Sequence, residues 1–214
     1  VLLNASVAVK ARAWSGGAWS ALNEAVFSVG ELGLPLRITE IHYHPAGGDA
    51  CEFLELENVG TLPLDIGGFS LQGVRYVFPD PTVLAPGAVA LLANNTHPEV
   101  FAARYPGVMV WGWFDGNLSN GGERIAVLDR EGRTVVAVHY DDQDGWPSEA
   151  NGGGPSLEIV DPRGDPNAPS NWRASSLVDG TPGLPSAPPT PGDGVLNEAS
   201  ADNATAVARH GAFP

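Results

Sequence analysis

Short segments of alternating apolar and polar residues, separated by glycine- and proline-rich turns, run through most of this 214-residue chain. Successive side chains of a β-strand point to opposite faces, so this period of two is typical of strands. The expected strands of the central part are 36–41, 52–58, 69–72, 74–78, 88–93, 123–129, 133–140 and 156–160. The 27 Gly and 19 Pro supply the turns between them. The pattern predicts an all-β, two-sheet sandwich over residues 36–183.

One segment departs from the strand pattern. Residues 97–105 read as a short helix, with Thr96 as its expected N-cap and Pro106 ending it. We therefore expect a single short helix in an otherwise β-structured domain.

The composition restricts the classes of partner. The chain has 25 acidic and 11 basic residues, for a formal net charge of −14, and such a surface repels nucleic acid and anionic membranes. No run of about 18 apolar residues is present, so no membrane insertion is expected. Cys51 is the single cysteine, which excludes a disulfide within the chain and a cysteine-based zinc site.

The first thirty residues form a separate pattern. Residues 7–13 alternate as a strand, Ser15-Gly16-Gly17 forms a turn, and residues 24–29 supply a second strand. With Trp14 and Trp19 beside the turn, the segment resembles the last hairpin of a fibronectin-type or chitobiase C-terminal sandwich. We expect residues 1–30 to be the end of a preceding domain and residues 31–35 to be a linker.

The C-terminal part begins with a second linker. Residues 182–191 read PGLPSAPPTP, which favours an extended polyproline conformation, and the linker is placed at residues 184–193. Beyond it, residues 195–198 (VLNE) align with residues 37–40 (RITE). Residues 194–214 are therefore expected to be the truncated start of a second, similar domain, whose unpaired strand could mediate a homo-oligomer.

Four sequence blocks resemble a known family. They are LRITEIHYHP, EFLELEN, LSNGGERIAVLD, and PSLEIVDP followed by SNWRAS. In this order they resemble a bacterial lamin tail domain, an immunoglobulin-like sandwich. The resemblance implies a non-catalytic structural or interaction module of a larger secreted or cell-surface bacterial protein. Its expected partners are other domains of the same polypeptide or cell-surface proteins, and it supplies no catalytic residues.

The blocks also predict local structure. In EFLELEN, Leu54 and Leu56 share one strand face, and the intervening residues share the other. Residues 120–122 (NGG) provide a tight entry turn into the strand that follows. Trp172 is expected to fill one end of the sandwich.

A metal site is the sharpest catalytic alternative. Glu40, His42 and His44 lie at every second position of one expected strand and could share a face. However, one strand supplies all three, and Pro45 indicates that His44 already leaves it. We expect no bound metal here, and a metal-dependent hydrolase is the least favoured hypothesis.

Calcium binding is a second alternative. Glu40, Glu55 and Glu57 would lie near one another if their strands pair, which would favour a calcium ion or one raised pKa. Residues 141–145 (DDQDG) are also acidic but lack the alternating oxygen ligands of an EF-hand loop. The sequence favours solvated acids, and no cofactor is expected.

Exposed aromatic residues raise the alternative of a polysaccharide-binding module. Trp111, Trp113, Trp146 and Tyr140 could stack on sugar rings, whereas packing of Trp111 and Trp113 into the sandwich is the simpler interpretation. Neither Ser119 nor Ser156 lies in the G-x-S-x-G setting of a nucleophile elbow. No catalytic residue is assigned, and the ligand-binding residues are unknown from sequence.

Overall fold

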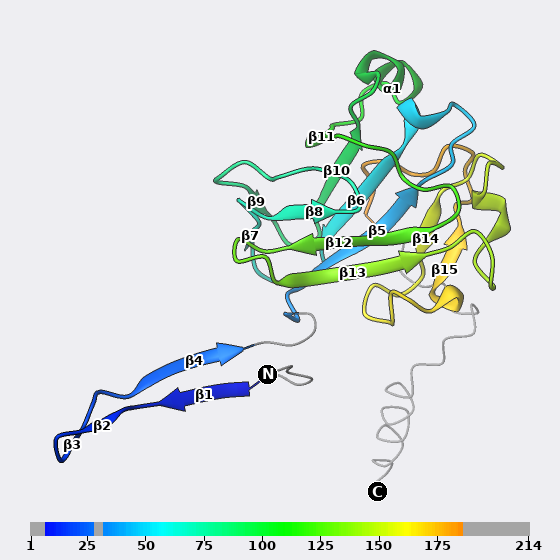
Figure 1. The fold of residues 1–214 in the computed structure, drawn as a ribbon. Helices are drawn as coiled ribbons and strands as arrows, with labels where there is room; N and C mark the ends of the chain where they lie inside the picture. Colours follow the sequence, from blue (N-terminus) through cyan, green and yellow to red (C-terminus); the bar gives the residue numbers. More distant parts are fainter. Residues whose placement is uncertain (1–6, 28–31, 186–214) are drawn as a thin grey trace, which may run out of the picture.

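The computed structural model describes residues 7–27 and 32–185 (Figure 1). The expected second domain at residues 194–214 lies outside the described residues, as does most of the proline-rich linker.

Two sheets form the main body, and the prediction of an all-β fold with one short helix is confirmed. The larger sheet runs in the order β11 (Gly112–Phe114), β10 (Val89–Asn94), β6 (Phe53–Asn58), β5 (Leu36–His42), β14 (Leu157–Ile159) and β15 (Trp172–Ala174). The smaller runs in the order β13 (Thr134–Tyr140), β12 (Glu123–Leu128) and β8 (Ser70–Gln72). Neighbouring strands are antiparallel, except for the parallel pair β10 and β11.

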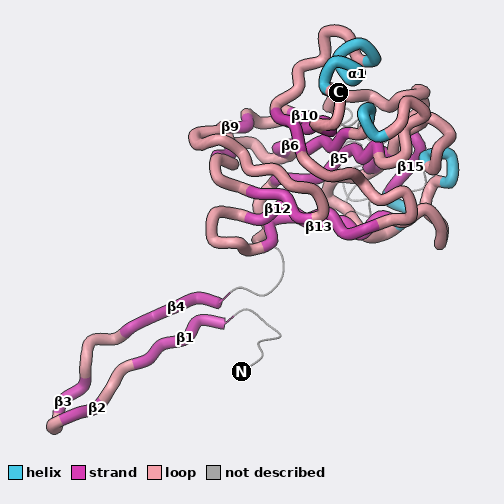
Figure 2. The backbone as a smooth tube through the Cα atoms, turned by 45° about the horizontal axis from the view of Figure 1, so that its top comes forward, coloured by secondary structure: helices cyan, strands magenta, loops and turns pink. Residues whose placement is uncertain are grey.

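Smaller elements complete the sandwich. They are the pair β7 (Leu64–Asp65) and β9 (Val83–Leu84), the helix α1 (Pro98–Arg104), and 3-10 turns at Asp49–Cys51, Ser148–Ala150 and Pro169–Asn171. Figure 2 shows how little of the backbone is helical. No helix among the described residues has the length and apolar character needed to span a membrane.

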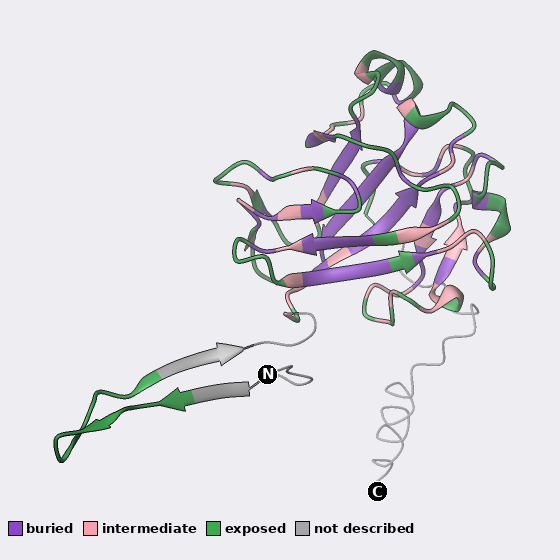
Figure 3. Cartoon of the chain, in the orientation of Figure 1, coloured by how far each residue is buried: buried purple, intermediate pink, exposed green. Residues whose placement is uncertain are grey.

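The main hydrophobic core lies between the two sheets (Figure 3). Leu54 and Leu56 of β6 and Ile125 and Val127 of β12 are fully buried in it, as the alternation in their sequence predicts. Trp172 is also buried and packs against Trp146 with ring centroids 5.9 Å apart, which confirms its expected place in the core.

A β-bulge at Thr39 changes the face on which the following residues lie. Ile38 pairs with Leu56 and Glu40 pairs with Glu55, so Thr39 is the extra residue. Ile38 and Ile41 therefore both reach the core, whereas Glu40 lies on the opposite, outer face of the larger sheet.

The outer face of the larger sheet is covered as well. Phe53 packs there with Phe101 of α1 and Tyr105, at ring-centroid distances of 6.4 and 5.9 Å. The segment after β15, residues 176–185, also contacts this face, and we call it the exit segment. Residues 53–58 are consequently all buried, although the alternation predicts one apolar side only.

The N-terminal segment forms the expected hairpin. β1 (Val7–Ala11) pairs with β4 (Asn23–Phe27), and β2 (Trp14–Ser15) pairs with β3 (Ala18–Trp19). The turn is at Gly16-Gly17, with φ of 58° and 81°. Residues 10–23 are all exposed (Figure 3).

Two local expectations differ from the structure. Residues 74–78 are not a strand, because Gly73 (φ 107°) turns the chain and leaves only isolated bridges at Arg75 and Val77. Thr96 is not the N-cap of α1; His97 takes that position, and the Thr96 hydroxyl donates to Asn94 Oδ1 at 2.6 Å.

The segment expected as the first linker also makes contacts with the sandwich. Leu32 and Leu34 pack against the core, and the Leu32 N–H donates to the Thr134 carbonyl at 3.0 Å. The Arg37 guanidinium holds the same segment, because it donates to the carbonyls of Leu34 at 2.7 Å and Pro162 at 2.9 Å.

Candidate functional site

Three glutamates form a row across the outer face of the larger sheet, which we call the glutamate row. Glu55 of β6 pairs directly with Glu40 of β5, and Glu40 pairs with Glu158 of β14. Directly opposed side chains have Cβ atoms about 4.5–5.5 Å apart, and like charges at that separation destabilise a sheet. The row therefore requires compensating partners.

The exit segment supplies most of these partners. The backbone N–H of Thr181 donates to Glu40 Oε1 at 2.8 Å, and the backbone N–H of Gly183 donates to Glu55 Oε1. The Thr181 hydroxyl lies 2.8 Å from Glu40 Oε2 and 3.1 Å from Glu158 Oε1. The row thus binds a segment of the protein's own chain.

Two other residues of the sheet complete the set. The Ser156 hydroxyl donates to Glu40 Oε1. Arg173 of β15 forms an ion pair with Glu158, with its Nε and Nη2 atoms both 3.2 Å from Glu158 Oε2. Arg173 neutralises the charge at one end of the row and leaves Glu40 and Glu55 without a cationic partner in these contacts.

The close approach of the exit segment depends on Gly180. This residue has φ of 76°, and a Cβ atom there would lie 2.7 Å from Ser156 Oγ and closer still to Glu40. A side chain at this position would push the exit segment away from the glutamate row.

The geometry of the row favours the retention of a proton. Burial raises the pKa of Glu40 to about 7, and burial together with the neighbouring Glu40 raises the pKa of Glu55 well above its usual range. The single proton of the Thr181 hydroxyl also lies between two carboxyl oxygens. A proton on Glu40 agrees with its raised pKa, and it leaves the Thr181 hydroxyl proton with one acceptor, the Glu158 carboxylate.

A cavity of about 170 Å³ lies between the row and the exit segment. Its lining includes Thr39, Leu184 and Pro185 as well as the three glutamates and Arg173. Thr39 Oγ1 is buried and has no hydrogen-bond partner in the structure.

The structure does not bring Glu40, His42 and His44 together as ligands. Nε2 of the buried His42 lies 2.9 Å from the Gly154 carbonyl, and Tyr105 Oη lies 3.3 Å from Nδ1. Burial lowers the pKa of His42 to about 4, so its ring is neutral near pH 7. His44 Nδ1 is instead paired with Asn151 Oδ1 at 2.7 Å.

The proximity of Glu40 and Glu55, expected if their strands pair, is confirmed. In residues 141–145, by contrast, the acids serve the loop itself: Asp141 accepts the Gln143 N–H at 2.9 Å, and Asp142 accepts Asn151 Nδ2 at 3.1 Å. Across residues 7–27 and 32–185, no three His, Cys, Asp or Glu side chains are grouped so as to hold a metal ion.

Glu52 is a buried carboxyl that the sequence interpretation did not single out. Its Oε2 accepts Asn94 Nδ2 at 2.9 Å and the Leu118 N–H at 3.0 Å, while its Oε1 has no partner. Burial raises the pKa of Glu52 to about 7. Its position just before a strand with alternating glutamates gave no separate signal.

The four aromatic residues considered for sugar binding do not form a platform. Trp146 and Tyr140 are buried, against Trp172 and Tyr43 respectively. Trp113 packs against Phe101 at a centroid distance of 5.8 Å. The alternative of a four-ring surface does not match the structure, because Trp172, Tyr43 and Phe101 of α1 provide apolar partners for three of the rings.

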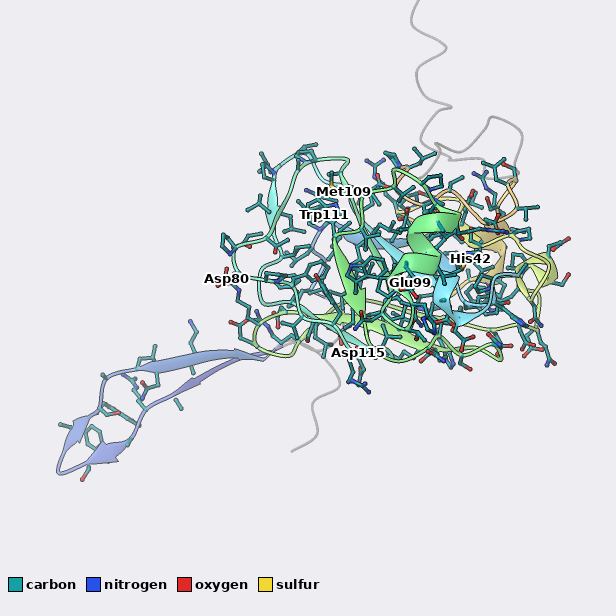
Figure 4. The ribbon with its side chains drawn as sticks, turned by 90° about the horizontal axis from the view of Figure 1, so that it is seen from above. His42, Asp80, Glu99, Met109, Trp111 and Asp115 are labelled. Atoms are coloured by element: carbon teal, nitrogen blue, oxygen red, sulfur yellow. The ribbon has the colours of Figure 1, made fainter. Side chains whose placement is uncertain are left out.

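Trp111 keeps 37% of its surface exposed and lines a surface groove of about 340 Å³. The other lining residues are Tyr76, Phe78, Pro79, Pro81, Thr82 and Val83, and we call this the aromatic groove. In Figure 4, Trp111 and Met109 lie near each other and away from His42.

Comparison with known proteins assigns the family. Residues 33–142 match the family described as Lamin Tail Domain. The chain belongs to this family. Glu40 and Glu55 lie within the matched part of the lamin tail domain, whereas Glu158, Arg173 and Thr181 lie beyond it. The family assignment agrees with the resemblance inferred from the sequence blocks.

A solved structure is also similar to this lamin tail domain protein. It is a DUF4876 family protein from Bacteroides thetaiotaomicron, with 12% identity and a TM-score of 0.42, and the alignment covers 85% of this chain and 83% of that one. No curated protein matches the chain.

Proposed function

We propose that this lamin tail domain is a non-catalytic structural and interaction module of a larger secreted or cell-surface protein, in which it fixes the geometry between neighbouring parts of the polypeptide. The observation that carries this proposal is the fastening of the exit segment to the glutamate row. Glu40 and Glu55 use their oxygens to accept hydrogen bonds from Thr181 and Gly183.

The entry into the sandwich is fastened in a comparable way. Leu32 bonds to β13, and Arg37 ties the following residues to the carbonyl of Pro162. Because both entry and exit are held on the folded unit, force or orientation applied at one end is transmitted through the sandwich rather than absorbed by a loose connection.

The same contacts argue against use of the glutamates as an acid and base pair. A catalytic carboxyl must reach a substrate atom at hydrogen-bond distance. Here the oxygens of Glu40 contact Thr181 and Ser156. These contacts support a fastening role for the row and a non-catalytic module.

Mechanical unfolding of the full chain, pulled from its two ends, tests the proposal. We expect the exit segment and the sandwich to unfold together in one cooperative event. Thr181→Val should separate them, with the exit segment releasing first at lower force. Thr61→Val, at an exposed loop position, is the matched control and should behave as the wild type. Release of the exit segment ahead of the sandwich in the wild-type chain would refute a fastened connection.

A further inference from the structure

The aromatic groove is a prominent apolar feature of the described surface. Val77, Val83 and Met109 lie at or near it with exposed fractions of 62%, 55% and 75%. Contiguous exposed apolar surface on a soluble domain commonly marks an interaction site. None of the seven lining residues is charged, although the chain as a whole is strongly acidic.

The walls of the groove are held in place before any ligand binds. Arg75 and Asp115 exchange two backbone hydrogen bonds of 2.9 Å, which join the segment containing Tyr76 to the segment containing Trp111. The Tyr76 ring lies directly over Gly112, where even a Cβ atom would overlap it. Its hydroxyl donates to the Trp111 carbonyl at 3.4 Å.

The groove has the chemistry that recognises a polyproline II segment. Such a segment has three residues per turn and leaves its own carbonyls free, and it docks in grooves lined by aromatic rings. Tyr76 and Trp111 supply the accessible rings, and the buried Phe78 supports Tyr76 in an edge-to-face contact at a centroid distance of 4.9 Å. The indole N–H of Trp111 makes no hydrogen bond to another described residue and can donate to a ligand carbonyl.

The chain itself carries a segment of this chemistry. Proline recurs at every third position in Pro182, Pro185, Pro188 and Pro191, and residues 182–191 contain no charged side chain. A period of three matches the turn of the polyproline II helix, so a segment in that conformation presents these prolines along one edge. The uncharged segment also suits an uncharged groove.

We propose that the aromatic groove binds residues 186–191 of a second copy of this chain. The inference deepens the proposed role as an interaction module by naming a partner for one surface. Its contact is heterologous, with the groove of one copy joined to the proline-rich segment of the next, and it therefore links copies head to tail.

The distance between Pro185 and the aromatic groove favours binding of a second copy's proline-rich segment over the chain's own. Pro185 lines the cavity over Glu40 and Glu158, on β5 and β14, whereas Trp111 directly precedes β11 at the far edge of the same sheet. The strand order from β14 through β5, β6 and β10 to β11 contains four spacings of about 4.8 Å, or about 19 Å. From Pro185, a polyproline segment extends about 9 Å to Pro188 and about 19 Å to Pro191, so the chain's own Pro188 cannot reach the groove.

Sedimentation of the full chain over a range of concentrations tests the proposal. We expect the average mass to rise with concentration up to about 1 mM, the weak range of affinity for a short peptide. Trp111→Ala and the double substitution Pro188→Ala, Pro191→Ala should each remain monomeric. Trp14→Ala removes another exposed tryptophan, from the hairpin, and should self-associate like the wild type.

A labelled peptide of residues 184–192 identifies the site directly. Its affinity for the full chain should fall at least about tenfold with Trp111→Ala and with Val83→Lys, which changes another lining residue. The Trp14→Ala chain should bind the peptide like the wild type. The two groove variants also keep the test valid if one of them does not fold, which circular dichroism would show.

Three results would overturn the proposal. One is a wild-type chain that stays monomeric and binds no peptide. Another is a monomeric chain that binds the peptide only after Pro188 and Pro191 are replaced, because the groove would then hold its own segment. The third is binding of a cello- or chito-oligosaccharide, but not the peptide, in a Trp111-dependent manner. None of these results alters the mechanical test of the exit segment, so the two proposals fail separately.

Discussion

Glu40 and Glu55 occupy directly opposed positions on two paired central strands, and both side chains are buried beneath the protein's own exit segment. Two ionised carboxylates at this separation repel each other strongly in a medium from which water is excluded. The backbone N–H groups of Thr181 and Gly183 compensate for part of the repulsion. The raised pKa values of both glutamates account for the remainder, because a proton shared by the pair removes one charge.

The stability of the protein should increase as the pH falls from 8 to 6.5. The pKa values of Glu40 and Glu52 are raised to about 7, so the stability they contribute is fully present below their usual value of 4.5 and is lost as the pH rises through 7. We expect urea unfolding to give a free energy higher by about 1–2 kcal/mol at pH 6.5 than at pH 8.

Below pH 6.5, His42 should offset part of the further increase from the glutamates. The pKa of His42 is lowered from 6.5 to about 4, so its contribution to stability is present above 6.5 and is lost as the pH falls toward 4. A protein that is more stable at pH 8 than at pH 6.5 would contradict the assignment of protonated buried glutamates.

Glu40→Gln should remove much of this pH dependence. The amide has the shape of a protonated carboxyl and can still accept the Thr181 N–H, but it cannot ionise. We expect the variant to equal or exceed the wild type in unfolding free energy at pH 8, with a smaller difference between pH 8 and pH 6.5. Glu99→Gln, at an exposed glutamate of α1, is the control and should keep the wild-type profile.

Thr181→Val should destabilise the protein by about 1–2 kcal/mol, because the buried Glu40 and the partly buried Glu158 each lose a hydroxyl partner. Thermal unfolding measures the change, and limited proteolysis should show faster cleavage within residues 176–185. Thr61→Val should stay within about 0.5 kcal/mol of the wild type. An unchanged cleavage rate in Thr181→Val would show that the hydroxyl does not hold the exit segment.

His42→Ala should cost about 2–4 kcal/mol of stability, because it creates a cavity and removes a buried hydrogen bond to the Gly154 carbonyl, which keeps only the Asp179 N–H as its donor. Its metal content should equal that of the wild type, since the pairing of His42 and His44 with other residues leaves no convergent ligand set. Elemental analysis of both purified proteins provides the measurement. Stoichiometric zinc that is lost in the variant would establish a metal site.

Removal of residues 192–214 should leave the melting temperature of the sandwich unchanged. This expectation follows from the alignment of residues 195–198 with residues 37–40, which predicts that the tail is the start of another unit. Calorimetry of the shortened and full chains compares them directly. A decrease of several degrees would show that the tail contributes to the folded core.

The architecture was predictable because alternation is a local property. Leu54 and Leu56 lie two residues apart and so share one face of their strand. That apolar face must be buried whichever strands lie beside it. The turn glycines are local in the same way, because Gly122 has φ of 89°, a conformation that glycine adopts readily. These constraints act within a few residues and are therefore visible in the sequence.

The fate of the polar and aromatic side chains was decided by contacts between residues far apart in the chain. Alternation predicted one apolar side for residues 53–58, but α1 and the exit segment bury the other side too. The bulge at Thr39 places Glu40 on this outer face, and strand order then puts Glu158 beside it. Trp113 and Trp111 are two residues apart, yet only Trp113 meets a helix that covers it.

The sequence by itself therefore determined the class of fold, the positions of most strands and the family. The tertiary structure alone decided that three glutamates meet, that they hold a segment more than a hundred residues after Glu40, and that one tryptophan remains at the surface. The physical reason is that strand periodicity depends on neighbouring residues, whereas burial, charge repulsion and pKa depend on which strands and segments come together in space.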